Sequence, residues 1–131
     1  MKKATEYFLN GYSCSESIVK IAVDKGLCSE ELLPVATTFS GGMSSGCLCG
    51  AVAGAQLVLG YNFGRENKMG NEVVARQKAK ALVDEFKARN KVTCCKILTN
   101  GLEGMERKHH CCKMVQDAEE ILNTLLEGVN V

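Results

Sequence analysis

The sequence predicts an all-α protein, a compact bundle of about five to seven helices that forms a single domain over residues 1–131. Three observations predict it. Apolar residues recur at helical spacing, and no segment keeps the alternation of apolar and polar residues that is typical of a half-buried strand. The length of 131 residues fits one domain. A hydrophobic content of 46% with 24% charged residues is typical of a compact core.

Capping residues mark the helices of the N-terminal part of the chain. Ser13 and Glu16 form a capping box, in which each side chain binds the backbone N–H of the other residue. Ser29 caps a further helix, and Pro34 is tolerated there because it lies close to the start. The glycine- and serine-rich residues 40–46 then end this helix. The predicted helices are residues 2–9, about 14–25, and a third that follows Ser29.

The longest apolar stretch, residues 47–61, predicts a buried fourth helix that starts near Cys49 and runs through Leu59. Gly50 and Gly54 lie one turn apart on it and expose a strip of backbone. Such a strip predicts close contact with another helix, within one chain or across the two-fold axis of a homodimer, and we favour the homodimer. The stretch is shorter than the ~20 apolar residues of a membrane span, so we expect no such span.

The C-terminal part contains three more predicted helices. After the polar residues 62–71, an apolar stripe at helical spacing predicts a long amphipathic helix. Thr93 then caps a short helical turn. The predicted elements are a helix that ends near Asn90, a turn that contains Cys94 and Cys95, and a last helix from about Cys111 to Glu127.

Charge and local motifs exclude several functions. Sixteen Lys and Arg against fifteen Asp and Glu leave a formal charge of +1, which is too small to attract nucleic acid or an anionic membrane surface. The N-terminus lacks a signal peptide, so we expect a cytoplasmic protein. Residues 41–46 lack the lysine of a phosphate-binding P-loop, and no Ser-His-Asp order or carboxylate pair indicates hydrolase chemistry.

Eight cysteines are the unusual feature of the composition. Structural disulfides are rare in a reducing cytoplasm, so these thiols indicate metal ligation, redox chemistry or core packing. Four fall in or next to the first turn of a predicted helix, where backbone N–H groups and the helix dipole favour a thiolate. They are Cys14, Cys49, Cys95 and Cys112. We therefore expect four helix starts to converge and the four sulfur atoms to lie within roughly 8 Å of one another.

The cysteine pairs at residues 94–95 and 111–112 are similar in sequence. Neighbouring helical residues point about 100° apart, so one thiol of each pair can face a site while the other packs or meets solvent. Three further thiols are therefore additional candidate ligands: Cys47, Cys94 and Cys111. His109 and His110 precede the second pair, but paired histidines after basic residues are typical of a solvated loop.

Residues 49–54, Cys-Gly-Ala-Val-Ala-Gly, match the Cys-Gly-Ala-x-x-Gly core of the C_GCAxxG_C_C family of redox-active proteins. The sequence resembles this family over nearly its whole length, and residues 11–14, 95–98 and 112–115 are similar to the other cysteine segments of the family. The resemblance implies a redox role but no particular substrate. The second cysteine of each pair is chosen because a hydrophobic residue follows it three places later. The four functional residues implied in this way are Cys14, Cys49, Cys95 and Cys112.

Three kinds of chemistry fit these cysteines. An iron–sulfur cluster accepts four thiolates and would make the protein an electron carrier. Thiol–disulfide exchange needs only two cysteines whose Cα atoms lie within about 7 Å and one of which is stabilised as a thiolate. It would make the protein an oxidoreductase that acts on a partner protein. Soft-metal binding would hold zinc or copper(I) without turnover. The sequence leaves open which of the three applies and which protein is the redox partner.

The predicted helix starts and the neighbouring lysines also predict the acidity of the thiols. We expect lowered pKa values at Cys49, Cys95 and Cys112. Cys28 follows the end of a predicted helix, and its pKa is expected near or above the reference of about 8.5. A lowered pKa would leave the three site thiols deprotonated and reactive at neutral pH.

Overall fold

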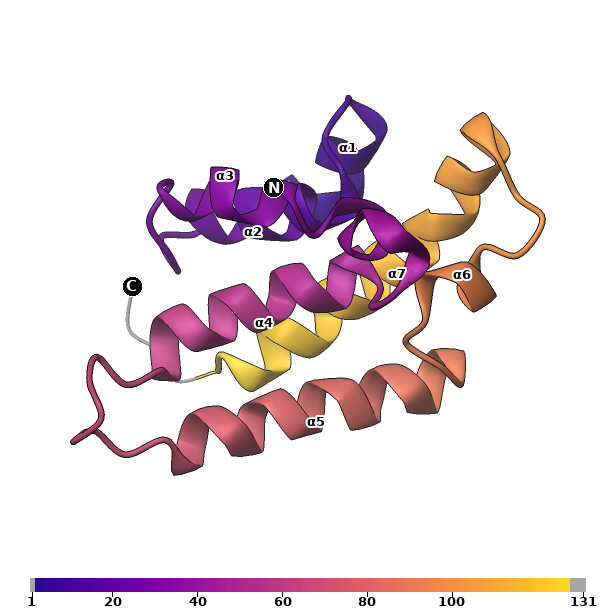
Figure 1. Ribbon diagram of the computed structural model, residues 1–131. Helices are drawn as coiled ribbons and strands as arrows, with labels where there is room; N and C mark the ends of the chain where they lie inside the picture. Colours follow the sequence, from indigo (N-terminus) through magenta and orange to yellow (C-terminus); the bar gives the residue numbers. More distant parts are fainter. Residues whose placement is uncertain (1, 128–131) are drawn as a thin grey trace.

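The computed structural model describes residues 2–127, and this part of the chain is helical, without a β-strand (Figure 1). Its helices are α1 (Ala4–Leu9), α2 (Cys14–Asp24), α3 (Leu32–Thr37), α4 (Gly50–Phe63), α5 (Val73–Asn90), α6 (Cys95–Leu98) and α7 (Gly104–Leu125). A wide turn, η1 (Gly42–Gly46), connects α3 to the segment before α4. The all-α prediction is therefore confirmed.

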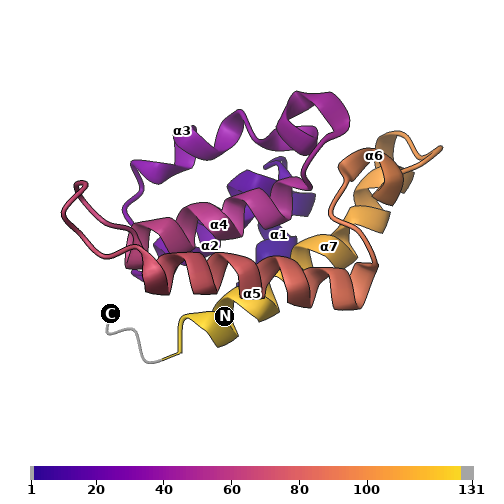
Figure 2. The same ribbon diagram turned by 60° about the horizontal axis from the view of Figure 1, so that its bottom comes forward.

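Helix α4 is the centre of the bundle because it is apolar on nearly every side. It lies between α2 and α5, and α7 packs against it as well (Figures 1 and 2). Helices α1 and α3 both pack on α2, whereas α6 and η1 contact each other at one end of the bundle. The largest fully buried side chains come from these central helices and include Ile18, Val58, Leu82, Phe86 and Leu122.

The contact between α2 and α4 is a contact of backbone with backbone. A Cβ atom on Gly54 would lie 2.7 Å from the carbonyl oxygen of Ser15 and 3.2 Å from Cβ of Ile18, both on α2. The predicted close contact of the glycine strip is confirmed. Because α2 of the same chain fills it, the strip supplies no evidence for the homodimer.

The start of α2 follows the sequence prediction, but the start of α7 does not. Ser13 Oγ accepts from the Glu16 backbone N–H at 3.3 Å, and Glu16 Oε1 accepts from the Ser13 N–H at 2.9 Å, which is the predicted capping box. Helix α7 begins at Gly104 rather than near Cys111. Five of the seven residues in its first two turns are polar or charged, so apolar periodicity could not show that a helix begins there.

Among residues 2–127, no helix has both the length and the apolar character that a membrane crossing requires.

Replacing Gly54 by alanine should lower the free energy of unfolding by about 1–3 kcal/mol, because the added methyl group would overlap the backbone of α2. Gly60→Ala is the matched control in the same helix, since its Cβ atom would meet no atom within 4 Å. This control should leave stability unchanged or raise it by about 0.5–1 kcal/mol through better helix propensity. Urea denaturation of the two variants measures both values, and a G54A protein as stable as G60A would contradict the packing analysis.

Candidate four-cysteine site

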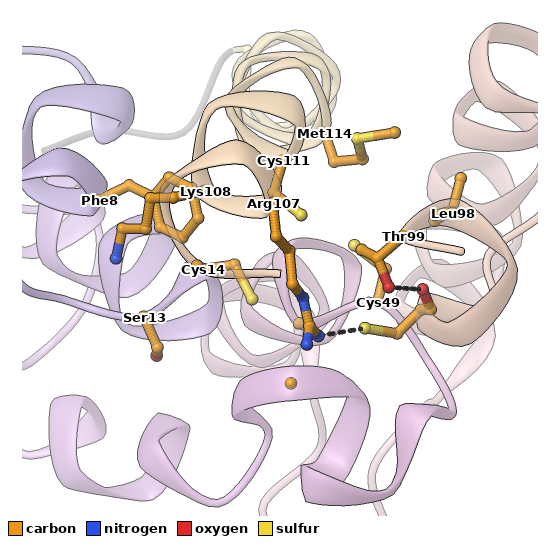
Figure 3. A pocket seen from close by; sticks show the side chains of 14 residues that line it. Phe8, Ser13, Cys14, Cys49, Leu98, Thr99, Arg107, Lys108, Cys111 and Met114 are labelled. Atoms are coloured by element: carbon orange, nitrogen blue, oxygen red, sulfur yellow. Dashed lines mark hydrogen bonds between the residues drawn. The ribbon is translucent and has the colours of Figure 1, made fainter. Parts of the chain in front are cut away.

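A cavity of about 230 Å³ lies among the ends of α2, α4 and α6 and one face of α7 (Figure 3). Four cysteines line it. Cys14 is the first residue of α2, Cys49 directly precedes α4, Cys95 is the first residue of α6, and Cys111 lies about two turns into α7. Four elements that are distant in sequence thus each contribute one thiol to one cavity.

Backbone pairing places two of these thiols beside each other. The Cys49 N–H donates to the Thr93 carbonyl at 2.7 Å, and the Cys95 N–H donates to the Cys47 carbonyl at 2.5 Å. These bonds flank an isolated antiparallel bridge between Leu48 and Cys94. The segment that leads into α4 is therefore held against the segment that leads into α6.

The structure brings together three of the four cysteines predicted from the sequence, Cys14, Cys49 and Cys95. Cys112 does not line the cavity, and its neighbour Cys111 does. The prediction that Cys112 lies in the first turn of a helix is wrong, because α7 starts eight residues earlier, at Gly104. On this longer helix, the face that carries Arg107, Cys111 and Met114 turns toward the cavity.

The other candidates lie outside the cavity. Cys47 is exposed, and the half-buried Cys94 directs its Sγ toward the Gly46 carbonyl at 3.5 Å. Cys28 is buried in the core, as expected for a packing residue. His109 and His110 are exposed, although a ring nitrogen of His110 lies 2.7 Å from the Leu98 carbonyl. Within residues 2–127, no three His, Cys, Asp or Glu side chains are already grouped as ligands of one metal ion.

The charge around the cavity is positive. Arg107 reaches from α7 into it, and its Nη2 donates to Cys95 Sγ at 3.5 Å (Figure 3). Lys108 also lines the cavity, with its Nζ bonded to the Tyr12 carbonyl at 3.0 Å and lying 4.1 Å from the centre of the Phe8 ring. Among the described residues that line the cavity, none is acidic. Negative charge introduced here would meet two cations and no carboxylate.

Burial controls the acidity of the site thiols. It raises the pKa of Cys49 to about 12, which outweighs the lowering by backbone hydrogen bonds at the start of α4. Burial is also the main cause of the raised pKa values of Cys14 and Cys111. These thiols are therefore protonated at neutral pH.

The expectation of lowered pKa values is wrong for Cys49 and Cys112. Burial raises the pKa of Cys112, and Lys108 only partly offsets this. Lys113, the cation expected to help, instead pairs with Asp117 at 2.7 Å. Burial raises the pKa of Cys28 to about 11, in agreement with its expected direction. The sequence placed Cys49 correctly at a helix start, but it did not show how much water that position loses.

A family model described as "Putative redox-active protein (C_GCAxxG_C_C)" matches residues 12–125. The chain belongs to this family. The matched range contains all four cavity cysteines. Comparisons with curated proteins and with solved structures gave no match.

The Cys-Gly-Ala-x-x-Gly motif of the C_GCAxxG_C_C family has a physical explanation in this structure. Its cysteine, Cys49, lines the cavity. A Cβ atom on its first glycine, Gly50, would overlap Cys14 Sγ and lie 3.1 Å from the Phe39 carbonyl oxygen. Its second glycine, Gly54, allows α2 to approach. The motif thus supplies one thiol and makes room for a second.

The raised pKa of Cys49 predicts alkaline destabilisation of the reduced, metal-free protein. Above pH 8.5 the thiol ionises in the unfolded chain, whereas in the folded chain it keeps its proton up to a pKa of about 12. The folded state then binds more protons than the unfolded state. The free energy of unfolding is therefore unaffected by this thiol well below pH 8.5 and decreases as the pH rises above it. Urea denaturation from pH 7 to 10 measures this slope.

Cys49→Ser is the control for this experiment, because a serine hydroxyl does not titrate in this range. The decline of stability with pH should be shallower in the C49S protein than in the wild type. Comparing slopes removes any constant effect of the substitution on stability. Identical slopes would contradict the assignment of a raised pKa to Cys49.

Proposed function

We propose that the four-cysteine cavity is a redox centre, in which Cys14, Cys49, Cys95 and Cys111 hold an iron–sulfur cluster for electron transfer with a partner protein. One observation carries the proposal. Four buried or half-buried thiols from four separate elements line one cavity of about 230 Å³. Membership of a family described as redox-active supports the general role.

The donor set suits such a cluster. Four cysteine thiolates are its usual ligands, and they need to converge in space rather than in sequence. A single zinc ion would need four sulfur atoms at about 2.3 Å from one point. The described side chains contain no such group of three ligands, and the thiols instead surround an open volume. This arrangement favours a group larger than one ion, and single zinc or copper(I) binding without turnover requires the thiols to move together.

The electrostatics of the cavity also support the proposal. Coordination to a metal deprotonates a thiol outright, so raised pKa values do not prevent ligation. Four buried thiolates bring negative charge, which Arg107 and Lys108 are placed to balance. When bound, an iron–sulfur cluster supplies one-electron chemistry, with a potential that depends on charge, burial and hydrogen bonds to sulfur. Arg107 already donates one such bond, to Cys95 Sγ.

Thiol–disulfide exchange is the second candidate. Cys95 favours it, because this residue lines both the cavity and a second hollow that is more open to solvent. Exchange requires a thiolate as the attacking group. The raised pKa values of Cys14, Cys49 and Cys111 leave few thiolates at neutral pH, which makes exchange slower at these three residues.

Replacing Cys111 or Cys112 by serine tests the proposal, because only the first of these neighbouring cysteines lines the cavity. Wild-type protein produced with iron and purified without oxygen should show a brown visible absorption that bleaches on reduction. The C111S protein should lose most of this absorption, because one of four ligands is missing. The C112S protein should keep it, because its thiol does not line the cavity.

Elemental analysis of the same wild-type samples separates the alternatives. A colourless protein that contains zinc or copper would support soft-metal binding. A colourless, metal-free protein that takes up two electrons while two thiols appear would support exchange. Loss of the absorption in C112S but not in C111S would contradict the assignment of Cys111.

A further inference from the structure

A second hollow, of about 440 Å³, lies on the outer side of Cys95. We call it the outer groove. It runs between η1 and α6, and it shares four residues with the four-cysteine cavity: Gly41, Cys95, Thr99 and Arg107. Its own lining residues are Ser40, Ser44, Gly46 and Lys96. Arg107 and Cys95 therefore form the partition between the buried site and a hollow that opens to solvent.

Within the described part of the chain, the charges that line the outer groove are positive. They belong to Lys96 and Arg107, and neither residue forms an ion pair with the described part of the chain. The other three arginines of the described chain do pair with carboxylates, as Arg89 does with Asp117 and Glu120. No acidic residue of the described chain lines the groove. Two cations at one hollow without carboxylates favour a negatively charged ligand.

The wall of the outer groove is an unusual turn that is held in place. Residues Met43 and Ser44 both have left-handed backbones, with φ of 62° and 57°. Such conformations are unfavourable for residues other than glycine and persist only where the surroundings enforce them. Here the Cys47 N–H donates to the Gly42 carbonyl at 2.8 Å and closes the turn.

Close packing against α6 keeps this turn in position. A Cβ atom on Gly42 would lie 2.6 Å from Cβ of Cys95, and one on Gly46 would lie 3.3 Å from Cβ of Lys96. The two elements on either side of the outer groove, η1 and α6, are thus in direct contact with each other. The groove is already shaped before any ligand binds, so little ordering free energy is needed on binding.

We propose that the outer groove binds a small anion, a carboxylate or a tetrahedral oxyanion, between Lys96 and Arg107. The planar guanidinium presents paired donors to an anion with two or more oxygens, and the ammonium adds a point charge. An anion on Arg107 lies next to Cys95, because the same guanidinium donates to Cys95 Sγ. The binding itself is independent of the proposed function. Only an influence of the bound anion on the redox centre, through Arg107 and Cys95, rests on that function.

NMR titration of the full-length protein tests the binding. Acetate and inorganic phosphate are the two probes, each added at constant ionic strength maintained with chloride. We expect saturable shifts of the backbone amides of residues 41–46 and 95–99. Tighter binding of acetate would identify a carboxylate ligand, and tighter binding of phosphate an oxyanion.

Three variants complete the test. Lys96→Gln should weaken binding of the better probe about fivefold or more, because it removes one charged hydrogen-bond donor. Arg107→Gln should weaken it further than Arg107→Lys, which keeps the charge. Lys87 is an exposed lysine on α5 that does not line the groove, and the Lys87→Gln protein should bind as the wild type does. Shifts that do not saturate, or a K96Q protein that binds like the wild type, would overturn the proposal.

The two proposals can fail separately. Anion binding that weakens in K96Q, in a protein that never shows a redox chromophore or a redox-active thiol pair, would support the groove and refute the proposed function. A chromophore in both wild type and K96Q, with no saturable binding of either probe, would refute the groove alone.

Discussion

The close approach of α2 to α4 is the contact on which the candidate site depends. Gly50 and Gly54 leave one side of α4 without side chains, and the backbone of Ser15 occupies this space. The same approach brings the start of α2, with Cys14, to the start of α4, with Cys49. Side chains on these glycines would separate the helices and also the two thiols. The helix contact that stabilises the bundle therefore also determines the relative positions of Cys14 and Cys49.

A second feature is the balance between burial and charge at the sulfur atoms. Helix starts stabilise thiolates, yet removal of water has the larger effect and raises the pKa values. Cys14, Cys49 and Cys111 therefore stay protonated at neutral pH until a metal ion binds them or oxidation removes their protons. Arg107 and Lys108 place positive charge beside these thiols. This charge does not offset the effect of burial, and the pKa values of Cys49 and Cys111 remain raised. Under the proposed function, binding of the cluster would remove the protons of these sulfur ligands, and the two cations would balance the negative charge of the thiolates.

The turn before α4 connects the buried site to the surface. Its left-handed residues are held by packing on α6, which fixes Cys95 between the cavity and the outer groove. Arg107 contacts the sulfur from the same side. One thiol and one guanidinium thus lie between the buried cavity and the outer groove.

Sequence patterns predicted the local features of this protein. Caps, glycines and apolar spacing predicted the all-α class, the start of α2, the buried α4 and the close contact at Gly54, because each depends on neighbouring residues. The family motif identified Cys49, and helix-start positions indicated Cys14 and Cys95. The tertiary structure decided the rest. Cys111 rather than Cys112 lines the cavity because the packing of α7 selects its inward face, and the pKa values rise because burial depends on every element that covers a thiol.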